Sequence, residues 1–306
     1  MKNKFAFSFF AFPGNAAREA WLLSKSIREF GGRFSECKIL LMVPNIKALS
    51  DVEEKIFTEL NVSIQHFEIN EDKLLFPFGG KTMAAGVAER ILAEKVETMV
   101  WMDCDSILFR EPGEMFLNEG THLGYRPVDH TLIGSNFNQP LDEFWQMIYK
   151  DCQVNEENIF PMMTSVDENE IRPYFNAGML IVRPKDGVLQ KWAKAFDRLF
   201  SKERYLEHYG KSALYKIFFH QAVLTGVLLS GISKESITEL PHIVNYPLHM
   251  HEKYPDSKRI QGLEELISCR YDQFFDGEGW EEKIPAEELL KNWILENRKV
   301  FEQELG

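Results

Sequence analysis

The sequence lacks long apolar runs and has few cysteines. No run approaches the roughly 18 residues that a membrane-spanning helix needs, so we expect no transmembrane segment. No two cysteines have CxxC spacing, which argues against a zinc site or a disulfide framework and favours a reducing, cytoplasmic setting; the four are Cys37, Cys104, Cys152 and Cys269. The stretch after Lys2 and Lys4 resembles a signal peptide, but its many phenylalanines favour a first β-strand at Phe5–Phe12.

Positive charge is also scarce. The 306 residues include 35 Lys and Arg against 47 Asp and Glu, which gives a formal net charge of −12. Surfaces that bind nucleic acid are basic, so we expect no nucleic-acid partner. An acidic chain that binds a negatively charged nucleotide must neutralise it locally, with a metal ion or with a few well-placed basic side chains.

Two common nucleotide-binding motifs, GxGxxG and GxxxxGK[ST], are missing, so neither a dinucleotide fingerprint nor a P-loop is present. The chain nevertheless alternates strand and helix patterns over its first hundred residues. We expect strands at 5–12, 37–43, 62–69 and 98–102, with helices at 16–30, 51–60 and 80–96 between them. This rhythm predicts an α/β fold with a parallel sheet and helices on both faces.

After residue 110 the pattern is looser. We expect strands at 121–127, 174–182 and 237–244, and helices at 141–152, 185–200, 220–229 and 286–305. A polar segment at 154–171 is predicted to be a long loop, and loops of this length are often lids or binding elements. No repeat and no Gly/Ser linker divides the chain, which favours a single domain.

Two carboxylates follow the most apolar predicted strand, Thr98–Met102. Asp103 and Asp105 are two residues apart, so on an extended backbone they share a face, and Cys104 is expected to point the other way into packing. Adjacent carboxylates repel each other unless a proton or a cation lies between them. Mg²⁺ or Mn²⁺ suits such oxygen ligands. Ligands of parallel sheets gather at the carboxyl ends of strands, so a functional pair is favoured over a polar turn.

The sequence Asp103-Cys104-Asp105 resembles the Asp-x-Asp motif of nucleotide-sugar-dependent glycosyltransferases with the A-type fold. A second segment, 175–178, reads Phe-Asn-Ala-Gly and resembles the corresponding strand of glycosyltransferase family 8 and its relatives. The resemblance spans roughly residues 5–251. It implies one A-type domain with a Rossmann-like mixed sheet: a nucleotide-binding half at 1–110, an acceptor and catalytic half at 111–260, and a C-terminal helical extension at 261–306.

The resemblance implies metal-dependent transfer of a sugar from a nucleotide diphosphate sugar, commonly a uridine one, with retention of anomeric configuration. The acceptor, whether a glycan, a protein or a small molecule, is not indicated. Asp105 would be the main ligand of Mn²⁺ or Mg²⁺, and Asp103 would bind ribose, the metal or both. A histidine near the C-terminal end is expected as a third ligand, and we favour His249 over His251.

Further site residues are implied around this pair. Lys81 follows two glycines at a predicted helix start, where it would contact phosphate or sugar, with a solvated lysine as the alternative. Asn176 and Gly178 would border the donor sugar. The base and ribose would lie against the loop after the first strand, formed by Phe12, Pro13 and Gly14.

One clear departure from family 8 lies at His220-Gln221, where relatives carry Asp-Gln near the reacting sugar. With Asn176, these two residues are the predicted catalytic set, and Gln221 would keep its hydrogen-bonding role. The change keeps open a protein that binds a nucleotide sugar without transferring it. A haloacid-dehalogenase-type phosphatase also carries Asp-x-Asp, but its downstream acidic motifs are missing here. The family 8 pattern His-x-x-Gly-x-x-Lys-Pro is missing as well.

Overall fold

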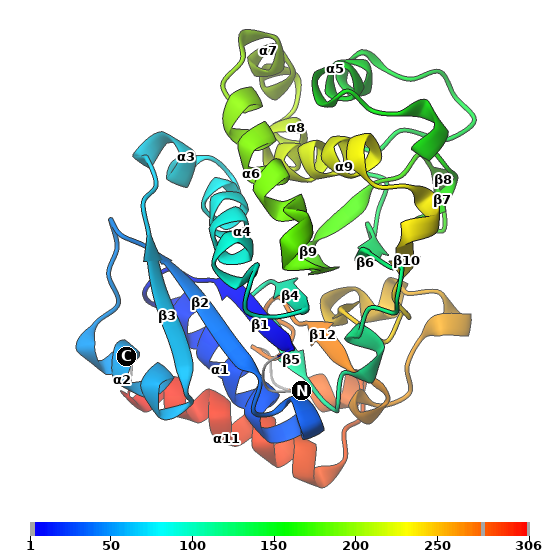
Figure 1. The fold of residues 1–306 in the computed structure, drawn as a ribbon. Coiled ribbons are helices and arrows are strands. Elements are labelled where there is room, and N and C mark those ends of the chain that lie inside the picture. Colours follow the sequence, from blue (N-terminus) through cyan, green and yellow to red (C-terminus); the bar gives the residue numbers. More distant parts are fainter. Residues whose placement is uncertain (1–3, 277–278, 305–306) are drawn as a thin grey trace.

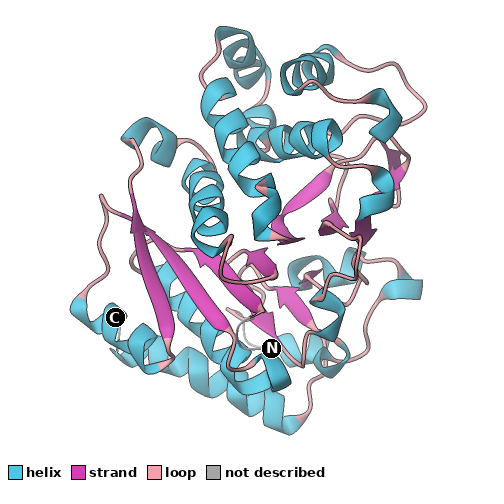
Figure 2. Ribbon diagram, viewed as in Figure 1, coloured by secondary structure: helices cyan, strands magenta, loops and turns pink. Residues whose placement is uncertain are grey.

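The computed structural model describes residues 4–276 and 279–304, and a seven-stranded mixed sheet organises them (Figures 1 and 2). The strand order is β10-β6-β9-β4-β1-β2-β3. The parallel half comprises β1 (Phe5–Phe10), β2 (Lys38–Pro44), β3 (Val62–Phe67) and β4 (Thr98–Met102). On the other side of β4, β9 (Phe175–Val182) runs antiparallel to both β4 and β6 (Leu123–Pro127), and β10 (Ile237–Glu239) is parallel to β6. The predicted α/β fold class is therefore confirmed.

Alternate side chains of β1 enter two cores, one on each face of the sheet. Phe5, Phe7 and Phe9 are fully buried on the face covered by α1 (Asn15–Phe30), whereas Ala6 is buried on the opposite face. That opposite face is covered by three helices, as Figure 1 shows: α4 (Gly79–Leu92), α6 (Val188–Leu199) and α9 (Phe219–Gly231). Strand alternation thus places a helical layer on each side, as the sequence pattern predicted.

A smaller three-stranded sheet joins the C-terminal segment to the first half. It has the order β11 (Tyr246–Pro247), β12 (Ser268–Arg270) and β5 (Ser106–Leu108). In the antiparallel pair of β12 and β5, Arg270 lies opposite Ser106. The segment after residue 261 is therefore more than a helical extension, because it supplies a strand beside Asp105.

The last helix, α11 (Glu288–Glu304), lies along α1 on the outer face of the sheet (Figure 1). The ring of Trp293 packs edge-on against Phe30 with centroids 4.9 Å apart, and Lys25 Nζ donates to Asn297 Oδ1. The remaining helices are α2 (Asp51–Glu59), α3 (Glu71–Leu75), α5 (Glu143–Cys152), α7 (Glu203–Lys211), α8 (Ala213–Ile217) and α10 (Trp280–Lys283).

Three features differ from the sequence prediction. The strand expected at 237–244 ends at Glu239, because the following Pro241 cannot donate to a strand ladder. The expected loop at 154–171 contains a short hairpin of β7 (Met162–Met163) and β8 (Glu170–Ile171). Helices α3, α7, α8 and α10 were not predicted; α3, α8 and α10 have four or five residues, too few to show a helical period, but α7 has nine, as many as the predicted α2. Within the described residues, no helix is both long and apolar enough to span a membrane.

Candidate active site

The carboxylate pair lies where the chain bends at the end of β4. The backbone N–H of Asp103 donates to the carbonyl of Gly178 in β9 at 2.8 Å, and the carbonyl of Asp105 accepts from the N–H of Tyr271 at 2.9 Å. Both aspartates line two adjoining cavities of about 300 and 400 Å³. The backbone bends here, and Cys104 packs against the core on the face that α1 covers, as expected. Its thiol donates to Glu19 Oε2 at 3.4 Å, and the residue lines the smaller cavity.

The smaller cavity is mostly apolar and lies beside the end of β1. Its apolar walls come from Phe10, Phe12, Leu74, Phe78 and Trp101. Phe12, which was predicted to contact the base and ribose, therefore lines this cavity. Pro13 and Gly14 instead form the turn into α1, where Gly14 has φ 89° and its N–H donates to Glu53 Oε1 at 2.8 Å.

The larger cavity has more polar side chains in its lining than the smaller one, and the amides of Asn176 and Gln221 are among them. Asn176 Oδ1 accepts from the N–H of Gly178 at 2.7 Å, which leaves the amide nitrogen of Asn176 as the group that faces a ligand. Gln221 Oε1 accepts from the N–H of Ala177 at 3.0 Å. Strand β9 thus fixes both amides, and Asp103, in a single arrangement around this cavity.

Gly178 makes this arrangement possible, because a Cβ there would lie 2.8 Å from Asn176 Oδ1 and 3.0 Å from Asp103 Oδ2. We expect Gly178→Ala to displace one of these groups, to destabilise the fold by about 1–3 kcal/mol through overpacking, and to lower activity. Thermal unfolding and donor turnover measure the two effects. Gly210→Ala is the matched control, since a Cβ there meets no atom within 4 Å and alanine favours the helix. Equal behaviour of the two variants would contradict the prediction.

Two cations compensate the acidic groups. Lys81 Nζ lies 2.5 Å from Asp103 Oδ1 and its side chain is 8% exposed, so the alternative of a solvated lysine is wrong. Arg270 Nη2 lies 2.9 Å from Asp129 Oδ2 in the larger cavity. Burial alone would lower the pKa of Arg270, but the carboxylates of Asp129, Asp105 and Asp103 raise it. Burial and then the charge of Asp103 raise the pKa of Asp105 to about 7.

Arg270 is the functional candidate that the sequence analysis missed. It lies in β12, a strand of three residues in a segment expected to be helical. The available signal was a lone arginine in the apolar and β-favouring run 266–271, but nothing in that run indicates which distant strand it joins.

His220 lies behind the site rather than in it. It is buried in α9, and its ring stacks on Phe78, whose side chain lines both cavities, with centroids 4.4 Å apart. Its Nδ1 lies 3.0 Å from the carbonyl of Ile217, which can only accept, so Nδ1 carries the proton. Burial and then the charge of Lys81 hold the pKa of His220 well below its usual value, so the imidazole is neutral.

The expected third metal ligand is not gathered with the aspartates. Among the side chains that the structure describes, in 4–276 and 279–298, no three His, Cys, Asp or Glu lie close enough together to hold a metal ion. His249 Nδ1 is buried without a hydrogen-bond partner, and burial followed by the charge of Arg270 lowers the pKa of His249. His251 Nδ1 is instead 3.0 Å from the hydroxyl of Tyr246.

The aspartate pair itself fits a divalent cation. Mg²⁺ is commonly held by one or two carboxylates, with water and substrate phosphates completing the shell. Asp103 and Asp105 offer two carboxylates on the wall between the cavities. A third ligand from His249 stays a prediction.

The sequence matches one family model. Residues 7–211 match the model described as the Rhodobacterales glycosyltransferase domain. No curated protein matches the sequence.

Solved structures of glycosyltransferases share the fold. The galactosyltransferase LgtC, in complex with donor and acceptor sugar analogues, gives a TM-score of 0.50 at 14% identity, covering 94% of this chain and 99% of that one. An active-site mutant of LgtC gives 0.52 at 13% identity, covering 90% and 93%. The bifunctional glycosyltransferase WbbM gives 0.54 at 13% identity, covering 98% of this chain but 52% of that one, so this chain spans about half of WbbM. The A-type fold implied by the motifs is confirmed.

Proposed function

The chain belongs to the Rhodobacterales glycosyltransferase domain family, and we propose that it transfers a sugar from a nucleotide diphosphate sugar to an acceptor with the help of Mn²⁺ or Mg²⁺. Membership makes the chain a glycosyltransferase, so the phosphatase and the non-catalytic binder are set aside. Uridine as the base, and retention of anomeric configuration, are proposed from the resemblance to family 8.

One observation carries the proposal: Asp103, Asp105, Lys81 and Arg270 meet between a mostly apolar cavity and one with more polar side chains in its lining. The groups along a nucleotide sugar follow the same order: a flat base, then a charged diphosphate, then a polar sugar. We place the base against Phe12 in the smaller cavity and the sugar against Asn176 in the larger cavity. The diphosphate then crosses the charged wall between them.

Breaking the bond to the anomeric carbon adds negative charge to the departing diphosphate. When bound at Asp103 and Asp105, a divalent cation would stabilise that charge as a Lewis acid. Lys81 and Arg270 offer fixed positive charge on either side of the same wall, in a partly buried setting where such charge acts strongly. Asn176 and Gln221 orient the sugar, with Asn176 donating from its amide nitrogen.

The protonation state of Asp105 should make nucleotide binding depend on pH. Its pKa of about 7 means that the carboxyl is partly protonated near neutrality, and the proton must leave before the group can act as an anionic ligand. We therefore expect metal-dependent binding of a nucleoside diphosphate to strengthen as pH rises from about 6 to 8. Calorimetric titrations at several pH values measure this, and a flat profile would contradict the role given to Asp105.

The direct test is a thermal-shift panel of nucleoside diphosphates with and without Mn²⁺. We expect uridine diphosphate with Mn²⁺ to give the largest shift, since a ligand at one hundred times its dissociation constant adds about 2.7 kcal/mol to stability. Asp105→Ala should abolish the metal-dependent part of the shift. Nucleotide binding that ignores Mn²⁺, or survives intact in Asp105→Ala, would remove the metal from the mechanism.

A further inference from the structure

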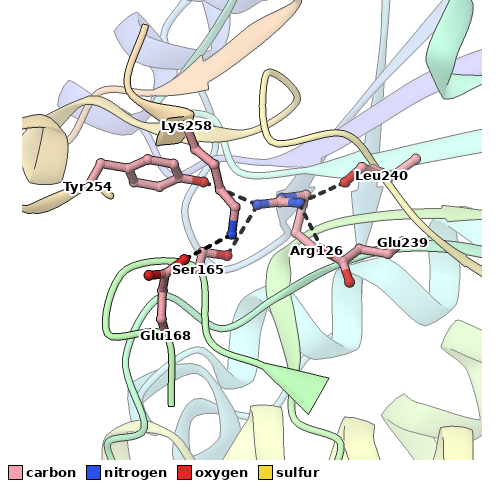
Figure 3. Close-up of polar contacts among 7 residues, drawn as sticks. All are labelled: Arg126, Ser165, Glu168, Glu239, Leu240, Tyr254 and Lys258. Atoms are coloured by element: carbon pink, nitrogen blue, oxygen red, sulfur yellow. Dashed lines mark hydrogen bonds and ion pairs between the residues drawn. The ribbon is translucent and has the colours of Figure 1, made fainter. Parts of the chain in front are cut away.

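A third cavity, of about 210 Å³, lies outside the active site at the end of β6 (Figure 3). Four segments form it: the end of β6, residues 163–165, residues 239–242, and the turn that carries Tyr254 and Lys258. Its polar side chains include Arg126, Ser165, His242, Tyr254 and Lys258. No residue predicted from the sequence to act in catalysis or donor binding lies here.

The positive charge of Arg126 is buried and poorly matched. Its side chain is 7% exposed, and the one carboxylate that the described residues place within 4 Å is Glu239, at 3.3 Å and itself 51% exposed. The other partners are neutral: the carbonyl of Leu240 at 2.7 Å, and the hydroxyl groups of Ser165 and Tyr254 at 3.2 and 3.3 Å (Figure 3). Buried charges normally have a close partner of opposite sign, so this guanidinium is suited to an added anion.

Lys258 adds a second positive charge to the cavity. Lys258 lines it and reaches across to Glu168 at 3.2 Å, in a pair whose two side chains are more than two-fifths exposed and which is therefore weak. Burial, followed by the charges of Arg126 and Lys258, lowers the pKa of His242. A neutral imidazole, two cations and the Glu239 carboxylate thus face the same small space.

The cavity shares a wall with the larger cavity of the active site. Arg126 lies three residues before Asp129, and Tyr254 lies four residues after Met250; Asp129 and Met250 line the active-site cavity. The wall is held by hydrogen bonds from the N–H groups of Ser165 and Val166 to the carbonyls of Val128 and Asp129, both 2.9 Å long. Residues that line the two cavities are therefore neighbours in the chain and are joined by these hydrogen bonds.

We propose that this cavity is a subsite for an anionic group, a carboxylate or a phosphate ester, carried by the acceptor. Either group could displace the Glu239 carboxylate and take over the charge-assisted hydrogen bond that Arg126 Nη1 now donates to it at 3.3 Å. Whole ligands occupy cavities of about 300–1,000 Å³, so a cavity of about 210 Å³ takes a charged group rather than an entire substrate. The link to an acceptor rests on the proposed function; binding of the anion does not.

The test is calorimetric titration of the full chain with inorganic phosphate. We expect one saturable site, weakened about tenfold or more in Arg126→Gln, because a hydrogen-bonded charge is lost. Lys258→Gln should weaken binding by a smaller factor. Glu239→Gln should tighten it, since that change removes the carboxylate that competes for Arg126. Arg259→Gln is the control: this arginine lies next to Lys258 in sequence, but its side chain hydrogen bonds to the carbonyls of Glu252 and Tyr254.

A separate variant excludes the donor site. Phosphate binding should persist in Lys81→Gln, whereas loss in Lys81→Gln with retention in Arg126→Gln would overturn the proposal. If Arg126→Gln does not fold, the other two variants test the subsite, because Lys258→Gln should weaken phosphate binding and Glu239→Gln should strengthen it. Unchanged phosphate affinity in both variants would overturn the proposal. Glycerol 3-phosphate, glucuronate and neutral glucose distinguish a phosphate ester from a carboxylate, and glucose should not bind. Uridine diphosphate binding, measured separately, reports on the proposed function.

Discussion

Arg270→Gln is expected to lower donor turnover by about 10²- to 10³-fold, the size of effect seen when one fixed group that stabilises transition-state charge is removed. Arg270 lies beside both Asp105 and Asp129 and lines the cavity proposed for the sugar. Its loss would leave the departing diphosphate with one fixed cation, Lys81. Release of uridine diphosphate from the donor, without an acceptor, measures the rate.

Two companion variants separate direct contact of Arg270 with the diphosphate from the balance of charge between Arg270 and Asp129. Arg270→Lys keeps the charge but loses the planar fork, so we expect an intermediate rate. Asp129→Asn removes the partner of Arg270 and leaves the guanidinium in place, so turnover should stay within about tenfold of wild type. Arg298→Gln is the matched control, since Arg298 forms an ion pair with Asp276 at 2.6 Å outside both active-site cavities. Wild-type turnover in Arg270→Gln would refute a role in catalysis.

The first half of the fold was predictable because each of its elements carries a local signal. The strand at 98–102 and the helix at 16–30 were expected within one residue of β4 and α1. Strands β5 and β12 have three residues each and pair with each other, with Ser106 opposite Arg270, while β12 also pairs with β11. A pattern confined to one stretch of sequence contains no information about that distant partner.

The same limit explains the site. Asp103, Asp105 and Asn176 follow or begin buried strands, so their meeting at one edge of the sheet could be expected from topology. The burial of His220 could not be predicted, because it depends on Phe78. This residue adopts a left-handed backbone conformation with φ 57° just before α4, and its ring covers the imidazole. The place of Arg270 depends in turn on the pairing of β12.

Asp105→Asn is expected to make the protein more stable at pH 8 while abolishing metal-dependent nucleotide binding. A carboxyl whose pKa is raised to about 7 in the folded state and lies near 3.8 when unfolded favours unfolding at high pH, since the unfolded chain releases its proton more readily. The free energy of unfolding of the wild type should therefore fall as pH rises from about 4 to 7. Asparagine does not ionise, so the variant should gain roughly 2 to 4 kcal/mol at pH 8.

The difference between the two proteins should shrink as pH falls toward 4, because the wild-type carboxyl is then protonated in the folded state and partly protonated in the unfolded state. Urea unfolding at pH 4, 6 and 8 measures it. Asp256→Asn is the control, since the Asp256 side chain is 91% exposed and the change should give the same small difference at every pH. With Mn²⁺ and uridine diphosphate present, the difference in free energy of unfolding between the two proteins should shrink or change sign. Those ligands stabilise only a protein that has the carboxylate. A pH-independent difference would mean that burial and the charge of Asp103 do not raise the pKa of Asp105, and that the pair is not poised for a cation.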